Sequence, residues 1–303
     1  LLRYLITQKP DVIFSAEDHL NLITTLACLF TFSKAKISTS SRVTPIDTYK
    51  NSNIIFSKSW FLKKCFPIVQ WKANVMTCVS KDMIGQYKKI FKKTKQVYVY
   101  NVVKNEDAIS RMNMKVNNKW FTNTKDPIIV ASGALAKWKG FDDLIKAANI
   151  LNKKNVNFKL VIIGGGPEKY TLNQLIRIYK LNKKVFILKP QINTLKYFHK
   201  SDIFVLSSRV EGMPSVMIEA MMCGCTVVAT NCLTGPREIL GKNEYGYLSK
   251  VNDPNDLSKN ISRALKKKIS LKKTKHILEQ FTSEQVIKRH FSLLKINRKY
   301  WMI

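Results

Sequence analysis

The chain has 303 residues, of which 45% are hydrophobic and 24% charged. This length and composition are enough for two globular domains and exclude a globally disordered chain. An excess of 52 Lys and Arg over 20 Asp and Glu leaves a net charge of +32, which indicates an anionic partner or surface. The excess is +11, +13 and +8 in residues 1–100, 101–200 and 201–303. The positive charge is therefore spread evenly along the chain, unlike the concentrated basic stripe of a nucleic-acid-binding domain.

The first 125 residues are expected to form an incomplete α/β domain. Strands are predicted at Val12–Ser15, Lys36–Thr39, Val75–Val79 and Val97–Tyr100, with helices between them. Doubly wound sheets usually have five or more strands, and the chain opens at Leu1 inside an amphipathic segment, so we expect the true N-terminus to be missing. The polar run from Asn113 to Asp126 is predicted to be the linker to a second domain.

From residue 126 to residue 281, short β-branched runs alternate with amphipathic stretches. Strands are predicted at Ile128–Ser132, Lys159–Ile163, Val185–Leu188, Ile203–Leu206, Thr226–Ala229 and Gly246–Leu248. Helices are predicted at Phe141–Leu151, Glu168–Leu181, Asn193–Lys200, Pro214–Met222, Pro236–Leu240 and Pro254–Leu265. This alternation predicts a parallel sheet covered on both faces, which is a second Rossmann-like domain.

The end of the chain and its lysine-rich clusters complete the predicted organisation. Residues 282–303 are predicted to form a helix that begins at the capping signal Thr282-Ser283-Glu284 and packs back on the first domain. The clusters Lys88–Lys95 and Lys266–Lys275 are interpreted as solvated faces. Six cysteines without a C-x-x-C pair lie in apolar runs, which is typical of thiols in a reducing compartment. No run approaches the ~20 apolar residues that span a bilayer, which predicts a soluble or peripheral protein.

Residues that directly follow the strands are the candidate site residues, because open α/β sheets bind ligands beyond the carboxyl ends of their strands. After the strand Ile203–Leu206 comes Glu211, and Pro214 is placed as the first residue of the next helix. Free backbone N–H groups at the start of a helix bind anions. They are expected here at Gly212, Met213, Ser215 and Val216.

Two carboxylates bracket these amides, since Glu219 follows Glu211 by eight residues. This arrangement suits a ligand with a phosphate at its centre and hydroxyl groups on both sides, such as a sugar nucleotide. The apolar neighbours of Glu219 predict a buried carboxylate, which needs a partner. The alternative, in which Glu211 caps the helix and Glu219 faces solvent, fits the same spacing.

Three further loops carry weaker signals. Lys137 and Lys139 precede Gly140 in a tight turn, where an ammonium group can reach a diphosphate. The run Gly164-Gly165-Gly166 permits close backbone approach, but it lacks the third glycine of G-x-G-x-x-G, which argues against NAD or FAD. The loop from Asn231 to Leu240 closes over the ligand or is a simple turn.

Taken together, these loops resemble the family 4 retaining glycosyltransferases, which have the GT-B fold. The resemblance rests on EGMPSVMIE from Glu211, KGFDDLIKAA from Lys139, VIIGGGPE ending at Glu168 and GPREIL from Gly235, and extends to PDVIF, TCVSKDM and VYVYNVV in residues 10–103. It looks closest to bacterial enzymes that add hexose or N-acetylhexosamine units to lipid-linked saccharides and lipopolysaccharide. It implies an α/β protein in which two Rossmann-like domains, residues 1–125 and 126–281, face each other across a cleft.

The resemblance also implies a role for each matching residue. Glu219 would bind the ribose hydroxyls, Glu211 a hydroxyl of the donor sugar, and Lys139 the leaving diphosphate. Glu211 and Lys139 are thus the candidate catalytic residues, with Glu211 orienting the sugar instead of acting as a base. The other candidate donor-binding residues are Gly212, Met213, Pro214, Ser215, Val216, Lys137, Gly133, Gly164, Gly165, Lys189 and Pro190.

The expected chemistry is metal-independent transfer with retention. The resemblance implies front-face attack, in which the departing phosphate deprotonates the acceptor hydroxyl and the protein positions the reactants. Departure of a diphosphate needs positive charge from a metal or from Lys, Arg and helix dipoles. No D-x-D motif occurs in the sequence, so no metal and no cofactor are expected, and a UDP-sugar is the favoured substrate.

Some residues depart from the family pattern. Ala134 stands where an Arg is usual, so half of a cationic pair is absent unless Lys137 replaces it. Lys189 stands where a Gly is often found, and Ser40, Ser41 and Arg42 stand where a His or Glu is common. His19 and Arg42 are the candidate acceptor-side residues, and the alternative for His19 is a helix-start or packing role.

The expected partners are a nucleotide sugar, a glycan or lipid-linked acceptor and an anionic membrane surface, without nucleic acid. The evenly spread positive charge would hold the first domain against anionic lipids on the cytoplasmic face of the inner membrane. Two alternatives stay open. One is a catalytically impaired fragment, favoured by Ala134 and the expected missing start. The other is a basic nucleic-acid-associated protein, for which no run of interleaved aromatic and basic residues is visible.

Overall fold

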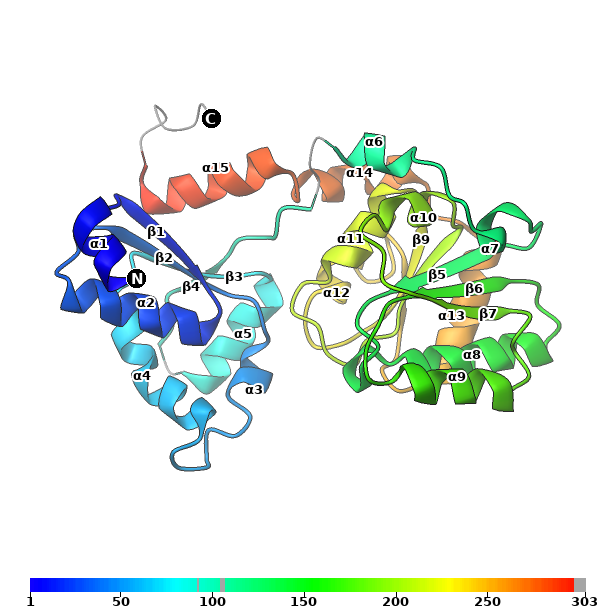
Figure 1. Cartoon of the computed structure of the whole chain (residues 1–303), viewed down its shortest axis with the longest axis horizontal. Coiled ribbons are helices and arrows are strands. Elements are labelled where there is room, and N and C mark those ends of the chain that lie inside the picture. Colours follow the sequence, from blue (N-terminus) through cyan, green and yellow to red (C-terminus); the bar gives the residue numbers. More distant parts are fainter. Residues whose placement is uncertain (92, 104–106, 297–303) are drawn as a thin grey trace. The chain divides into compact units, whose positions relative to one another are not determined.

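The computed structural model describes residues 1–91, 93–103 and 107–296, which form two compact α/β units (Figure 1). The first unit comprises residues 1–101 together with the segment from Glu284 onward, and the second comprises Val102–Ser283. No helix in the described part of the chain is long and apolar enough to cross a membrane. All six cysteines are free, and only Cys65 is not buried.

The first unit is built on a parallel four-stranded sheet in the order β1-β2-β3-β4. Its elements are α1 (Leu2–Gln8), β1 (Val12–Ala16), α2 (Asp18–Phe30), β2 (Lys36–Ser41), α3 (Pro45–Thr48), α4 (Lys58–Lys72), β3 (Val75–Cys78), α5 (Lys81–Ile90), β4 (Gln96–Tyr98) and α15 (Ser283–Leu294). The apolar side of α2 supplies Ala27 and Cys28 to a core that includes Leu5 and Ile37. In the register of the first strand pair, Ile13 lies opposite Ile37.

The second unit is built on a parallel six-stranded sheet in the order β10-β9-β8-β5-β6-β7. Its elements are α6 (Ala108–Met112), α7 (Lys119–Thr122), β5 (Ile128–Ser132), η1 (Lys137–Lys139), α8 (Phe141–Lys153), β6 (Lys159–Ile163), α9 (Lys169–Ile178), β7 (Val185–Leu188), α10 (Leu195–His199), β8 (Ile203–Leu206), α11 (Ser215–Met222), β9 (Thr226–Thr230), α12 (Pro236–Leu240), β10 (Tyr247–Ser249), α13 (Pro254–Lys266) and α14 (Leu271–Glu279). Figure 1 shows α8, α9 and α13 on one face of this sheet and α10 and α11 on the other. Because both faces are covered, the central strands β5 and β8 are almost entirely buried apolar residues.

The chain passes from the first unit to the second at residues 101–102, earlier than the polar linker expected at residues 113–126. The residues of that run pack on the second unit. Trp120 stacks on Phe186 with ring centroids 5.3 Å apart, and the Phe121 ring meets that of Tyr197 edge-on with centroids 5.1 Å apart. Aromatic residues within an otherwise polar run thus anchor it to a fold, because their burial outweighs the loop propensity of their neighbours.

Two helices near the chain end differ in how well the sequence indicates them. The helix α15 begins at Ser283, close to the predicted capping signal, and contacts the first unit, where the Arg289 side chain donates to the carbonyl of Tyr98 (2.8 Å). The sequence does not predict the helix α14, because its many lysines obscure the spacing of its few apolar residues. Its lysines are solvated, as interpreted from the sequence, and only Thr274 and Leu278 are buried.

Candidate functional site

The glycines predicted to bind a donor come together at the carboxyl ends of β5, β6 and β7. A Cβ atom on Gly164 would lie 2.0 Å from the carbonyl oxygen of Gly133, and one on Gly165 would lie 2.9 Å from Pro190. A side chain at Gly164 would therefore clash with backbone, and one at Gly165 would have to displace the Pro190 ring. The structure thus brings Gly133, Gly164, Gly165 and Pro190 into one cradle, with Lys189 exposed at its edge.

The turn that carries Lys137 and Lys139 is fixed by the loop after β8. Gly140 ends the turn at φ +61°, and a Cβ atom on it would lie 2.1 Å from the carbonyl oxygen of Ser207. The loop after β8 then donates to three consecutive carbonyls of the turn. The Arg209 guanidinium donates to Lys137, the Arg209 backbone N–H to Trp138 (2.7 Å) and the Ser207 hydroxyl to Lys139 (2.8 Å). Two segments about seventy residues apart therefore behave as one rigid piece.

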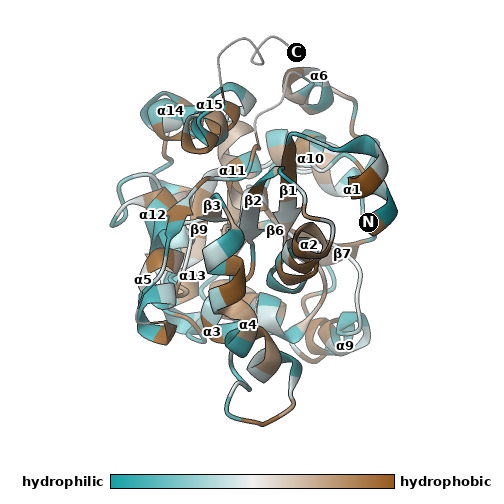
Figure 2. Ribbon diagram, turned by 90° about the vertical axis from the view of Figure 1, so that its left-hand side faces the viewer, coloured by the Kyte–Doolittle hydropathy of each residue, from teal (hydrophilic) through white to brown (hydrophobic). Residues whose placement is uncertain are grey.

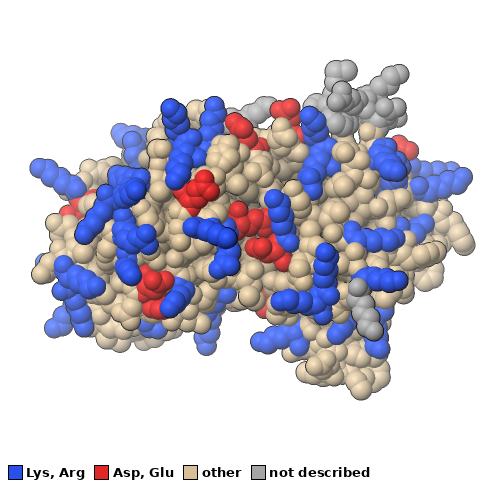
Figure 3. Space-filling view, turned by 180° about the vertical axis from the view of Figure 1, so that it is seen from behind, with Lys and Arg blue, Asp and Glu red and all other residues tan. Residues whose placement is uncertain are grey.

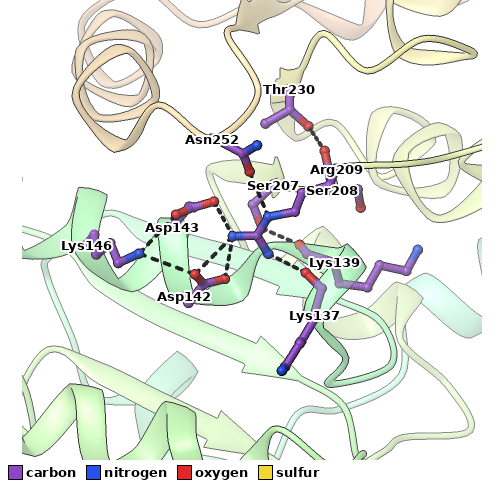
Figure 4. Close-up of polar contacts among 10 residues, drawn as sticks. All are labelled: Lys137, Lys139, Asp142, Asp143, Lys146, Ser207, Ser208, Arg209, Thr230 and Asn252. Carbon is purple, nitrogen blue, oxygen red and sulfur yellow. Dashed lines mark hydrogen bonds and ion pairs between the residues drawn. The ribbon is translucent and has the colours of Figure 1, made fainter.

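Arg209 is the centre of a charged cluster that sequence reasoning missed (Figure 4). Its Nη2 lies 2.6 Å from Asp143 and 3.0 Å from Asp142, and its Nε donates to Asn252 (2.7 Å). Lys146 pairs with both aspartates at 3.3 Å. Burial opposes ionisation of Asp142, but the hydrogen bond and charge of Arg209 outweigh it and lower the pKa of this carboxyl. The ammonium groups of Lys137 and Lys139 point away from the cluster.

The two predicted catalytic residues form an ion pair. Lys139 Nζ lies 2.6 Å from Glu211 Oε1, and the side chains are only 18% and 11% exposed. The Ser208 hydroxyl donates to the same oxygen at 2.6 Å, and none of the described residues bonds to Oε2. The carbonyl of Glu211 accepts from the Thr234 hydroxyl, and a Cβ atom on Gly235 would lie 2.6 Å from Pro214. The loop before α12 therefore packs against the loop that carries Glu211 and holds the Glu211 backbone in place.

The start of α11 differs by one residue from the prediction. The helix begins at Ser215, with Pro214 as its N-cap. The Ser215 N–H donates to the carbonyl of Met213 (2.9 Å), so Ser215 is not one of the free donors, and the prediction was wrong on this point. Within the described residues, the N–H groups of Gly212, Met213 and Val216 have no acceptor, which leaves three donors next to Glu211 at the positive end of the helix.

Glu219 lies inside α11 and is half-buried. Burial raises the pKa of its carboxyl, and the charge of Arg111 on α6 opposes this shift. No hydrogen bond or ion pair joins the Glu219 carboxylate to another residue in the described part of the chain, so the direct partner expected from its apolar neighbours is absent; its backbone carbonyl accepts from the Cys223 N–H (3.0 Å). A half-buried carboxylate without a bonded partner has acceptor capacity available for a ligand.

The candidate acceptor-side residues lie in the first unit. His19 is in the first turn of α2 and half-buried, and exposed Arg42 follows β2 and donates to Asn101 (3.1 Å). Asp18, which sequence reasoning missed, is the first residue of α2 and precedes His19. Asp18 accepts from Ser41 (2.5 Å), Tyr49 (3.0 Å) and Tyr87 (3.2 Å). Burial raises its pKa, and these hydrogen bonds oppose the shift. Asp18 thus ties the start of α2, which carries His19, to the end of β2, which Arg42 follows.

The chain has two α/β units, each built on a parallel sheet, and the second carries a lysine–carboxylate pair and free helix-start amides beyond its strands. This architecture is the GT-B fold of glycosyltransferases. Residues 112–281 match the family model "Glycosyl transferases group 1", and the chain belongs to this family. An uncharacterized glycosyltransferase of Methanocaldococcus jannaschii is 31% identical over 263 residues, which cover 80% of this chain and 62% of the relative. A Bacillus anthracis N-acetyl-alpha-D-glucosaminyl L-malate synthase is 26% identical over 72% of this chain and 58% of its own length. The chain therefore spans about three fifths of these relatives.

Solved structures share the fold at low sequence identity. Anabaena HepE in complex with UDP and glucose has a TM-score of 0.79 at 14% identity, covering 98% of this chain and 81% of that chain. Staphylococcus aureus TarM, in a complex that contains UDP, has a TM-score of 0.75 at 20% identity, covering 97% and 58%. The α/β GT-B fold and the family predicted from the sequence are confirmed.

Proposed function

We propose that this protein is a retaining, metal-independent glycosyltransferase. It would move a hexose or N-acetylhexosamine from a nucleoside-diphosphate sugar, with UDP favoured, to a glycan or lipid-linked saccharide in cell-surface polysaccharide synthesis. The observation that carries the proposal is the Lys139–Glu211 pair beside the free amides of Gly212, Met213 and Val216. A cation and a set of fixed N–H dipoles at one point are what a departing diphosphate requires.

In this proposal the chain supplies position and charge, and no residue serves as a nucleophile. The amides and Lys139 would hold the diphosphate, while Glu211 would turn Oε2 toward a donor-sugar hydroxyl and keep Lys139 in place through Oε1. Because Lys139 is already fixed by Glu211 and by the turn that Arg209 holds, little reorganisation is needed when negative charge develops on the leaving group. The departing phosphate would take the proton of the acceptor hydroxyl.

The remaining candidate residues would surround the nucleotide. The Glu219 carboxylate, which has no bonded partner among the described residues, would accept from the ribose hydroxyls, and the cradle around Gly164 would admit the rest of the donor against backbone. Lys137 would lie at the phosphate end, and Lys189 and Pro190 at the edge of the cradle. His19 and Arg42 would lie on the acceptor side, with no cofactor and no nucleic acid involved.

The names of similar proteins support the choice of substrates. HepE and TarM were solved with UDP. A Campylobacter jejuni relative, 36% identical over 141 residues, is named as an N-acetylgalactosaminyltransferase for a diphospho-undecaprenol substrate. A polyprenyl-linked acceptor and the net charge of +32 support a peripheral site of action on the cytoplasmic face of the inner membrane.

A thermal-shift screen of nucleoside-diphosphate sugars, followed by a transfer assay, tests the proposal. A bound donor raises the unfolding temperature because it stabilises the folded state by an amount that grows with the logarithm of its concentration relative to its Kd, and at equal concentration we expect UDP-sugars to give the largest shift. Transfer is expected to continue in EDTA, because Lys139 and the amides supply the positive charge. Binding without transfer in a full-length chain would favour the catalytically impaired alternative, and loss of transfer in EDTA would contradict the metal-free mechanism.

Glu219→Gln is expected to weaken UDP affinity about 10- to 100-fold, because hydrogen bonds to a charged acceptor contribute about 1.5–3 kcal/mol. The pH dependence of UDP affinity is expected to have a definite sign. Burial raises the pKa of Glu219 above its usual value of 4.5, so wild-type affinity is expected to fall as the pH drops through that raised pKa and the carboxylate gains a proton. Calorimetry should show this dependence in the wild type and not in the variant, which shares every other titrating group. Equal affinities would refute the ribose assignment.

A further inference from the structure

The segment from residue 49 to residue 72 of the first unit presents apolar side chains to solvent. At the tip of the loop between α3 and α4, Ile54 is 60% exposed, Ile55 65% and Phe56 88%. Phe56 also has φ +64°, a left-handed conformation that is uncommon for a bulky residue. Exposed apolar clusters of this kind on soluble proteins mark contact sites for other molecules.

This loop is an ordered turn. The Ile54 N–H donates to the carbonyl of Asn51 (3.0 Å), and the Ser57 N–H donates to that of Ile54 (3.1 Å). The Ser57 hydroxyl accepts from the Trp60 N–H (3.1 Å) and so caps α4. The Phe56 ring lies 5.7 Å from that of Trp60. These hydrogen bonds within the loop fix its backbone in the conformation that exposes the side chains of residues 54–56.

The helix α4 continues the apolar surface away from the tip. Its inward face buries Leu62, Phe66 and Val69, which accounts for its packing in the fold. A second apolar stripe, at Phe61, Ile68 and Trp71, is 53%, 37% and 72% exposed. These positions are seven and three residues apart, so they share one helix face. Core packing of the first unit does not require this second stripe.

The charge around this apolar surface has one sign. Residues 48–80 contain five lysines, at positions 50, 58, 63, 64 and 72, and no Asp or Glu. Figure 2 shows the loop below α4 changing from hydrophilic to hydrophobic at its lower turn. At the lower right of Figure 3, the same end of the unit shows only basic and uncharged side chains. An apolar tip with lysines that reach outward is the composition of an interfacial membrane anchor.

We propose that Ile54, Ile55 and Phe56, with Phe61, Ile68 and Trp71, form a docking surface for an anionic lipid bilayer. The inference rests on the proposed function, which places the transferase at a membrane. It assigns the membrane contact to this one docking surface instead of to the positive charge spread over the whole chain. A second copy of the chain is disfavoured as the occupant, because a two-fold contact would bring these lysines against their own copies. Anionic headgroups complement the same lysines.

Co-sedimentation with vesicles tests this surface on the complete chain, with vesicles of phosphatidylcholine containing about one third phosphatidylglycerol to supply the negative surface potential. The double variant Ile55→Ser/Phe56→Ser is expected to bind them at least about tenfold more weakly, because it removes apolar area that inserts. Lys58→Gln/Lys64→Gln is expected to bind about tenfold more weakly at low salt and to lose much of the salt dependence. Both variants change exposed side chains, so thermal unfolding should stay close to the wild type.

Phe32→Ser is the matched control, because Phe32 is 90% exposed, has φ +52° and lies outside the surface. It is expected to bind vesicles like the wild type. The proposal is overturned if Phe32→Ser loses as much vesicle binding as Ile55→Ser/Phe56→Ser, or if Ile55→Ser/Phe56→Ser loses none. It is equally overturned if the wild type does not bind anionic vesicles. It is also overturned if light scattering shows that the double variant dissociates a dimer. Stabilisation by UDP, measured on the same proteins, tests the transferase proposal separately. Loss of vesicle binding with intact UDP binding, or the reverse, therefore shows which of the two proposals fails.

Discussion

Lys139→Met is expected to lower turnover in the transfer assay about 10²- to 10³-fold, the effect of removing one preorganised charge-stabilising group at a reacting centre, about 2.7–4 kcal/mol. The donor KM should change much less, because the amides of Gly212, Met213 and Val216 and the carboxylate of Glu219 would still bind the nucleotide. The effect is expected on kcat since the leaving diphosphate carries more negative charge in the transition state than in the bound donor.

Lys146→Met is the matched control for this substitution. Lys146 lies on α8 and pairs with Asp142 and Asp143 at 3.3 Å, but its ammonium group does not approach Glu211. The turnover of Lys146→Met is expected to stay within about threefold of the wild type, because Lys146 is itself partly exposed and its contribution is screened by solvent. In a double-mutant cycle, Lys139→Met and Glu211→Gln should be strongly non-additive, because Lys139 Nζ and Glu211 Oε1 are in direct contact. Additive effects, or a turnover of Lys139→Met near the wild type, would contradict the assignment.

Arg209→Met is expected to be the most destabilising of these substitutions, lowering the free energy of unfolding by about 2–3 kcal/mol. Removing one partner of a buried ion pair costs more, but Arg209 is 27% and Asp142 35% exposed, so solvent screens part of the loss. Asp143, only 9% exposed, would keep Lys146 as its remaining cation. Urea unfolding of the second unit measures the change.

Arg209 is also a positioning residue for catalysis, since its guanidinium holds the carbonyl of Lys137 in the turn that carries Lys139. Turnover of Arg209→Met is therefore expected to fall about 10- to 100-fold with little change in donor KM, as for misplacement of a group that stabilises the transition state. Adding Asp143→Asn should restore part of the stability, because the uncompensated carboxylate is removed, without restoring turnover. Recovery of both together would show that Arg209 acts on stability alone.

Local sequence patterns predict the strands of the second unit well. The bounds of β5, β6, β7 and β8 agree with the predicted runs to the residue, because a strand covered on both faces is an unbroken apolar run between polar loops. Helix ends are predicted less well. The helix α11 starts at Ser215 and not at Pro214, since a proline suits either the N-cap or the first helical position and the sequence does not separate the two.

Side-chain partners far apart in the chain are the part that local patterns miss. The loop before α11 draws attention to Glu211, but its bond to Lys139 joins residues 72 positions apart. Arg209 is one of 52 basic residues, and only the fold places it beside Asp142, Asp143 and the carbonyl of Lys137. Asp18 is hidden for the same reason, because its partners Ser41, Tyr49 and Tyr87 come from three other segments.

The amino-acid sequence by itself determined the family, the alternation of strands and helices and the loops that hold the site, because each of these depends on residues adjacent along the chain. The tertiary structure decided which charges meet, which amides stay free and which apolar side chains remain in solvent. Those properties depend on contacts between distant segments. Among the described residues such contacts pair Lys139 with Glu211 and leave the Glu219 carboxylate without a bonded partner.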